Sequence, residues 1–186
     1  MKIMLNDTRL AFPSLWTPSV PKGGQGKPAF SGSFLIPPTH KQLAQLRKAM
    51  RQVAAEKWGA KADAVYKALE TTDKLCLHNG DAKTEYDGFE GMLFVSARSQ
   101  VRPLVIDQAK NPLTESDGKP YSGCYVNANL ELWAQDNQFG KRINAQLRGV
   151  QFLRDGDAFS GGGRPADPDE FEDISADEGD TDPLTE

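Results

Sequence analysis

The sequence contains no apolar run long enough to span a bilayer, and no charged and then apolar leader at its start. Its 186 residues include only two cysteines, Cys76 and Cys124, which excludes a disulfide framework. We therefore expect a cytoplasmic protein with no membrane partner. In that compartment both thiols are expected to be reduced.

Groups that enzymes bring together for catalysis are also scarce. The two histidines, His40 and His78, have no companion ligands at a familiar zinc spacing. Gly26 and Lys27 do not form a phosphate loop, because prolines occupy the positions where that motif needs glycine and Ser or Thr. Nucleophile elbows, nucleotide fingerprints and zinc-binding helix pairs are likewise missing from the sequence. The sequence thus predicts a protein that is not an enzyme and uses no cofactor or metal.

What the sequence does contain is a strong asymmetry of charge. Residues 155–186 carry twelve Asp and Glu against the single base Arg164, a formal charge of −11. The whole chain is at −4, so residues 1–154 are at +7. Such a division is typical of a polyanion-binding body joined to an acidic interaction tail. We expect one domain over residues 1–154 and a tail over residues 155–186.

The tail is expected to be disordered when it is alone. It begins with a glycine-rich hinge at Ser160–Gly163, and prolines interrupt the rest. Its few large apolar residues cannot offset the entropy of ordering it. These apolar residues could instead be bound by a protein partner. The alternative is a tail that only keeps the protein soluble. The candidate partner-binding residues are Phe171, Ile174, Asp180, Asp182, Leu184 and Glu186.

Hydrophobic periodicity predicts a mainly β body with an inserted helical segment. A helix capped by Thr39 should run to about Trp58, with Gly59 ending it, and a shorter helix should follow. Asp87-Gly88 suggests a turn between two paired strands. This order fits a small mixed or antiparallel barrel. The strands are expected as one or two short ones in 2–16, then in 29–36, 81–99, 104–107, 121–133 and 143–153.

Two of these strands have one apolar and one polar face. In 93–99 the apolar Leu93, Val95 and Ala97 alternate with Phe94, Ser96 and Arg98. In 121–133 five apolar residues from Cys124 to Leu132 alternate with polar residues and rings. Exposed rings beside bases are what a single-strand nucleic-acid binder requires. For each ring among the candidates, core packing is the alternative. The candidates are Lys22, Lys27, Tyr86, Phe89, Phe94, Arg98, Arg102, Tyr121, Tyr125, Trp133, Lys141 and Arg142.

Several stretches resemble a family of bacteriophage single-stranded-DNA-binding proteins that was long uncharacterised. They are residues 86–99, the Arg102-Pro103 pair that follows, and residues 121–128 and 147–157. The resemblance covers most of residues 1–157 and suggests an enterobacterial phage member. It implies an oligonucleotide-binding barrel (OB-fold-like) with an acidic C-terminal tail. It also implies a role in phage DNA replication or recombination, which takes place in the cytoplasm of the infected host. The acidic tail is then expected to contact phage replication or recombination proteins.

Two other functions remain open at this point. The acidic tail could itself be the active surface of an inhibitor or mimic that acts on a host enzyme. Alternatively, the chain could be a phage assembly protein that the tail keeps soluble.

Overall fold

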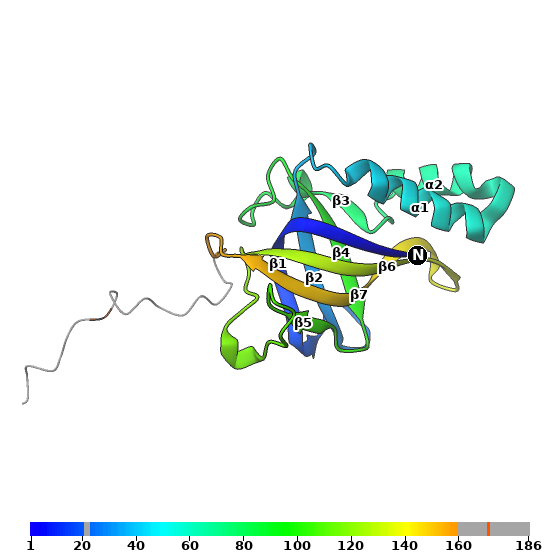
Figure 1. Cartoon of the computed structure of the whole chain (residues 1–186). Coiled ribbons are helices and arrows are strands. Elements are labelled where there is room, and N and C mark those ends of the chain that lie inside the picture. Colours follow the sequence, from blue (N-terminus) through cyan, green and yellow to red (C-terminus); the bar gives the residue numbers. More distant parts are fainter. Residues whose placement is uncertain (21–22, 160–170, 172–186) are drawn as a thin grey trace, which may run out of the picture.

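The computed structural model describes residues 1–20, 23–159 and 171, which form a β-barrel with a helical hairpin at its side (Figure 1). Within these residues one seven-stranded sheet has the order β3-β4-β2-β1-β6-β7-β5. The elements are β1 (Lys2–Ser19), β2 (Ala29–Ile36), α1 (Leu43–Trp58), α2 (Ala62–Thr71), β3 (Leu77–Asn79), β4 (Leu93–Ser99), β5 (Leu104–Ile106), β6 (Tyr125–Asn137) and β7 (Gly140–Arg154).

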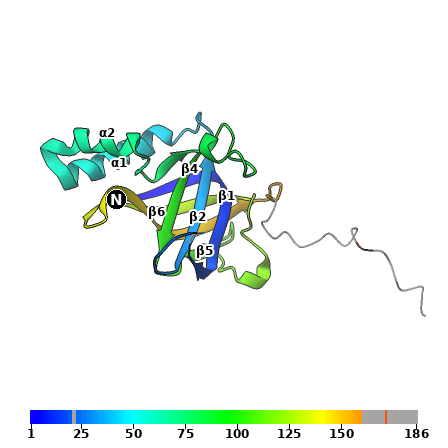
Figure 2. The same cartoon turned by 180° about the vertical axis from the view of Figure 1, so that it is seen from behind.

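The barrel closes through a short parallel pairing. β1 pairs antiparallel with β2 and β6, β2 with β4, and β6 with β7. β4 then meets β7 in parallel, with Ala97 opposite Ala145 and Arg98 opposite Gln146. The result is a five-stranded barrel of the oligonucleotide-binding type, as predicted. Figure 2 shows it from behind; β5 pairs in parallel with β7 and is an edge strand of the sheet.

The first strand differs from the prediction of one or two short strands. β1 is a single strand of 18 residues that bends, with breaks in register between Leu5 and Thr8 and between Ala11 and Ser14. Asp7 and Phe12 have positive φ at these breaks, 53° and 48°. The residues that look like strand breaks in the sequence are therefore β-bulges, which bend the strand and allow it to pair with β2 and β6.

The barrel interior is the main core. The predicted apolar face of β6 is confirmed, since Cys124, Val126, Ala128, Leu130 and Leu132 are at most 1% exposed. Burial raises the pKa of Cys124 to about 11 and that of Cys76 to about 12. Both cysteines are free and stay protonated, which makes them structural residues rather than nucleophiles.

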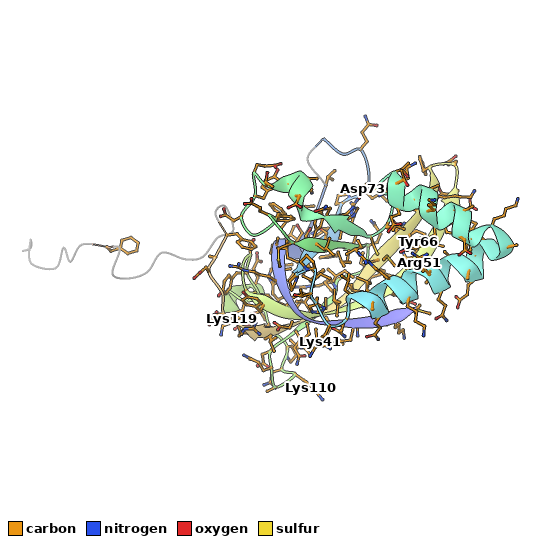
Figure 3. All side chains as sticks on the ribbon, turned by 90° about the horizontal axis from the view of Figure 1, so that it is seen from above. Lys41, Arg51, Tyr66, Asp73, Lys110 and Lys119 are labelled. Atoms are coloured by element: carbon orange, nitrogen blue, oxygen red, sulfur yellow. The ribbon has the colours of Figure 1, made fainter. Side chains whose placement is uncertain are left out.

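The helical hairpin packs its apolar side against the barrel. α1 buries Leu46, Met50 and Val53, and Gly59 ends it as expected. The predicted cap at Thr39 is wrong, because the helix begins at Leu43. The Gln42 side chain bonds to the backbone of β1 instead, accepting from Asn6 N at 2.7 Å and donating to Met4 O at 2.9 Å. Figure 3 shows Arg51 of α1 over the Tyr66 ring of α2, 4.4 Å from its centroid.

A second apolar cluster lies on the outside of the barrel. The predicted strand pair within 81–99 is wrong, because residues 80–92 form a 3-10 turn and a loop that cover the outer face of β4. Asp87 and Gly88 do lie in a turn, but not in a hairpin. The buried residues of this cluster are Ala11, Leu35, Phe89, Phe94 and Phe159.

The packed body extends to Phe159, five residues into the segment that we assigned to the tail. Phe159 N donates to Ser122 O at 3.1 Å, and the Arg9 guanidinium lies 4.3 Å from the Phe159 ring centroid. Lys22, the hinge at Ser160–Gly163, and Ile174, Asp180, Asp182, Leu184 and Glu186 lie outside the described residues. None of the helices in the described ranges is long and apolar enough to cross a membrane.

Candidate nucleic-acid interface

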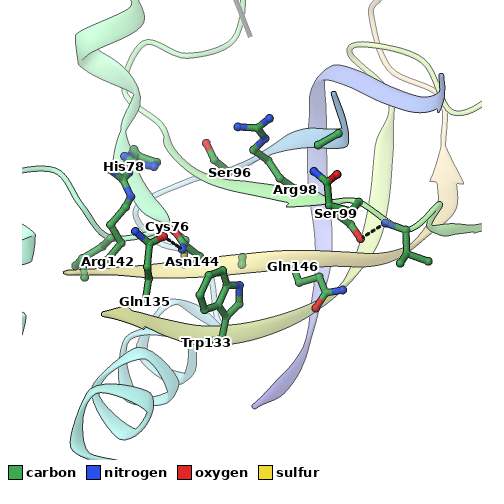
Figure 4. A pocket seen from close by; sticks show the side chains of 15 residues that line it. Cys76, His78, Ser96, Arg98, Ser99, Trp133, Gln135, Arg142, Asn144 and Gln146 are labelled. Carbon is green, nitrogen blue, oxygen red and sulfur yellow. Dashed lines mark hydrogen bonds between the residues drawn. The ribbon is translucent and has the colours of Figure 1, made fainter. Parts of the chain in front are cut away.

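A cleft of about 570 Å³ opens where β3 and β4 diverge from β6 and β7 (Figure 4). It exists because β4 and β7 pair only around Arg98 and Gln146 and then separate. The small side chains of Ala29 and Ala145 lie in its lining. Among the residues that the structure describes, no Asp or Glu lines it. The other lining residues are Leu75, Cys76, His78, Ser96, Arg98, Ser99, Gln100, Val101, Trp133, Gln135, Arg142, Asn144 and Gln146.

Three of the predicted nucleic-acid-binding residues converge on this cleft. Arg98 comes from β4, Trp133 from β6 and Arg142 from β7. The β6–β7 register places Trp133 beside Asn144, and Gln135 beside Arg142. Trp133 is 45% exposed, so its ring is available to a ligand rather than part of the core. The cleft therefore combines a free aromatic ring with two guanidinium groups.

Two hydrogen bonds hold residues of the polar wall of the cleft in place. Asn144 Nδ2 donates to Gln135 Oε1 at 3.0 Å, a bond that is visible in Figure 4. Val101, which lines the cleft beyond the end of β4, donates its backbone N–H to Ser99 Oγ at 3.0 Å. These contacts limit the motion of the wall beside Trp133.

The hairpin between β6 and β7 is braced by α1. Trp58 Nε1 donates to Asp136 Oδ2 at 2.9 Å, and Lys141 Nζ lies 3.2 Å from Asp136 Oδ1. The hydrogen bond from Trp58, and to a smaller extent that from Lys141, lowers the pKa of Asp136. Lys141, a predicted phosphate contact, is thus tied to Asp136 beside the turn of the hairpin. At its tip Phe139 is 79% exposed, a ring that the sequence analysis did not select.

Two other predicted bases lie outside the cleft. The Arg102 guanidinium is 5.5 Å from the Trp16 ring centroid, in the loop beyond β4. Lys27 is exposed in the loop before β2. Both remain available to a polyanion, but neither lines the cleft.

The two predicted tyrosines near the end of β7 contact the barrel's own groups. Tyr121 OH donates to Asp155 Oδ1 at 2.7 Å, and burial followed by this bond raises the pKa of Tyr121. The Tyr125 ring lies 4.1 Å from the Arg154 guanidinium and 5.6 Å from that of Arg9. Neither ring reaches the cleft.

The prediction that Phe89 and Phe94 are exposed for stacking is wrong. They are 1% and 3% exposed. Phe94 does lie on the outer face of β4 with Ser96 and Arg98, as the alternation indicated, but the loop 80–92 and Phe159 cover that end of the face. Tyr86, by contrast, is 40% exposed.

A family model described as the single-stranded-DNA-binding protein of Enterobacter phage Enc34 matches residues 1–182. The chain belongs to this family. The resemblance seen in the sequence is therefore confirmed.

Relatives of the family share most of the chain. A protein named p50, from Acyrthosiphon pisum secondary endosymbiont phage 1, is 49% identical over 178 residues, which are 94% of this chain and 95% of that protein. The solved Enc34 protein has a TM-score of 0.65 at 27% identity, covering 84% of this chain and 83% of its own. The same Enc34 protein has been solved in complex with single-stranded DNA, with a TM-score of 0.65 at 26% identity, covering 84% of this chain and 88% of its own.

A more distant structure shares the fold of the family. The single-stranded DNA-binding protein gp2.5 of bacteriophage T7 has a TM-score of 0.56 at 12% identity, covering 82% of this chain and 91% of its own. At that identity the likeness shows the barrel fold alone.

Proposed function

We propose that this chain binds single-stranded DNA with little sequence preference, in the cleft between β4 and β7. The observation that carries the proposal is the exposed Trp133 ring between Arg98 and Arg142 on a barrel whose Enc34 relative has been solved with single-stranded DNA. Trp133 stacks on a base, and the two guanidinium groups contact phosphates. Neither contact reads the identity of the base, so binding tolerates any sequence.

We further propose that the chain acts by binding and not by catalysis. The two guanidinium groups of the cleft serve as anchors for phosphates. Among the described residues no three or more of His, Cys, Asp and Glu are grouped to hold a metal ion. In this proposal the protein coats single strands during phage DNA replication or recombination, in the cytoplasm of the infected cell.

The affinity for single-stranded DNA is expected to fall steeply with salt. The body carries +7, and each phosphate neutralised on a single strand contributes about −0.7 to the log–log slope, so several contacts give a slope of roughly −2 to −5. Fluorescence anisotropy with labelled single and double strands at four salt concentrations measures it. Double strands should bind more weakly, because their bases are stacked inside the helix.

A flat salt dependence would reject the phosphate contacts, and equal affinity for both forms would reject the stacking. Absence of binding to either form would leave the inhibitor and assembly functions as the alternatives.

For the acidic tail we propose two roles, autoinhibition and partner recruitment. Residues 167–186 hold ten carboxylates and no Lys or Arg, tethered to a body of opposite charge. Short flexible tethers give effective concentrations of about millimolar, so the tail competes with DNA for the basic cleft. Bound DNA displaces it and frees its apolar residues, Phe171 among them, for a replication or recombination protein.

Deleting residues 167–186 is therefore expected to tighten DNA binding, most strongly at low salt, where the attraction between tail and body is least screened. The deletion should also abolish recruitment of the partner. The same anisotropy titration at two ionic strengths measures the first effect. A variant with every Asp and Glu of 167–186 changed to Asn and Gln is the matched control, because it keeps the length. Equal affinities for the full and truncated chains would reject autoinhibition. The tail would then act only by recruiting a partner or by keeping the protein soluble.

A further inference from the structure

A continuous series of ring contacts leads away from the cleft. His78 lines the cleft and stacks on Phe94, with centroids 5.0 Å apart and an angle of 28° between the rings. Phe94 contacts Phe89 at 5.1 Å, and Phe89 contacts Phe12 at 5.7 Å. Phe12 finally meets Tyr86 edge to face at 4.9 Å. The buried middle of the series supports exposed rings at its far end.

The far end consists of two exposed rings on a fixed base. Phe12 is 49% exposed and Tyr86 is 40% exposed, while Phe89 beneath them is 1% exposed. Tyr86 also contacts Phe89, with centroids 6.1 Å apart. Exposed rings are usually mobile, but these two are held from below by a packed cluster. They therefore present fixed aromatic surface to solvent.

The backbone at Phe12 is in a conformation that Phe rarely adopts. Its φ of 48° lies in the left-handed region, at the bulge where β1 changes register against β2. A non-glycine residue there costs stability, and such strain is concentrated at functional sites. The bulge directs a large ring out of the barrel, where a smaller or polar residue would suit the backbone better.

One basic side chain lies along the series, in the loop 80–92, which also carries Asp81, Glu85, Asp87 and Glu90. The Lys83 ammonium lies 5.2 Å from the Phe94 ring centroid, between His78 and the exposed pair. Asp73 Oδ1 lies 2.7 Å from His78 Nδ1, which orients that ring at the edge of the cleft. A DNA backbone that passes from the cleft over this stretch would meet an ammonium group before it reaches the two rings.

We propose that Phe12 and Tyr86 form a second base-stacking site for the same DNA strand that occupies the cleft. The strand leaves Trp133 and Arg98, passes His78 and Lys83, and stacks its further bases on the two exposed rings. This inference rests on the proposed function and adds to it a direction for the strand and a longer binding site. The occupant is single-stranded DNA rather than a protein, because the ring series starts at His78 in the lining of the cleft and the Lys83 ammonium lies over its next ring.

The test compares a short and a long oligothymidine on the full chain. Oligonucleotide-binding barrels occlude roughly 4–16 nucleotides, so lengths of about 5 and about 15 nucleotides span the range from the cleft alone to both sites. In the wild-type protein the long strand binds more tightly. In a Phe12→Asn, Tyr86→Ala double variant the ratio of the two affinities should fall by at least about tenfold, because the loss of even one stacked base has that effect.

The substitutions are chosen so that misfolding cannot imitate the result. Asn tolerates the left-handed region better than Phe, so Phe12→Asn removes the ring without adding backbone strain. Tyr86→Phe keeps the ring and should keep the wild-type ratio. Leu104→Ala, on a 61% exposed residue of β5, is the control for loss of exposed apolar surface. Thermal melting checks that each variant is folded. If the double variant is unfolded, the single variant Tyr86→Ala replaces it in the comparison of the two strand lengths.

An unchanged ratio in the double variant would overturn the second site and assign the rings to another partner. If the wild-type protein bound neither the short nor the long oligothymidine, the proposed function itself would be overturned. Trp133→Ala separates the two sites further, because it should weaken the short strand as well as the long one.

Discussion

Replacing Phe94 with alanine is expected to lower the free energy of unfolding by about 3–5 kcal/mol, the range for deletion of a buried phenyl ring. Its ring is 3% exposed and contacts Phe89, His78 and the Lys83 ammonium. Removing it leaves a cavity between β4 and the loop 80–92, which cannot close fully. Urea denaturation followed by circular dichroism measures the change.

Ser96→Ala is the matched control, because Ser96 lies two residues further along the same outer face of β4 and is only half-buried. It should change the free energy of unfolding by no more than about 0.5 kcal/mol. If Phe94→Ala kept its stability and lost only DNA affinity, the ring would be a ligand contact and the outer cluster would not be a core.

Replacing Trp133 with alanine is expected to weaken single-stranded DNA binding roughly tenfold to a hundredfold, with little loss of stability. Stacking of one base on an aromatic ring contributes about 1–3 kcal/mol, and the Trp133 ring is 45% exposed. Anisotropy titration of a labelled oligothymidine at one fixed salt concentration measures it.

Trp133→Phe keeps a flat aromatic face and should recover most of the affinity. Arg98→Ala should weaken binding as well, but it should also reduce the salt slope by about 0.7, because it removes a phosphate contact instead of a stacking contact. If the Trp133→Ala variant bound DNA with wild-type affinity, the DNA would have to bind outside the cleft.

Much of this protein follows from local patterns in the sequence. The alternation from Cys124 to Leu132 predicts which face of β6 enters the barrel, because successive side chains of a strand point to opposite sides. The spacing of Leu46, Met50 and Val53 predicts the buried side of α1, and Gly59 its end. The separation of charge between body and tail is a property of composition and needs no fold.

The sequence pattern also selected Trp133, Arg98 and Arg142 as candidates, but not as neighbours. They lie on three strands, 35 and 9 residues apart in sequence, and only the closure of β4 on β7 brings them to one cleft. Phe139 and Phe12 were missed for a related reason. A single ring in a polar turn, or next to a proline, has no periodic partner that would indicate exposure.

The failures at Phe89 and Phe94 show what only the tertiary structure could decide. Alternation assigns Phe94 to the outer face of β4, and that assignment is right. Whether the outer face of β4 is exposed to solvent depends on two distant segments. The loop 80–92 folds back over this face, and Phe159, near the other end of the described chain, packs against it. Strand periodicity reports the direction of a side chain relative to its own backbone. Burial depends on which distant segment covers that side chain, and this is settled only when the whole chain has packed.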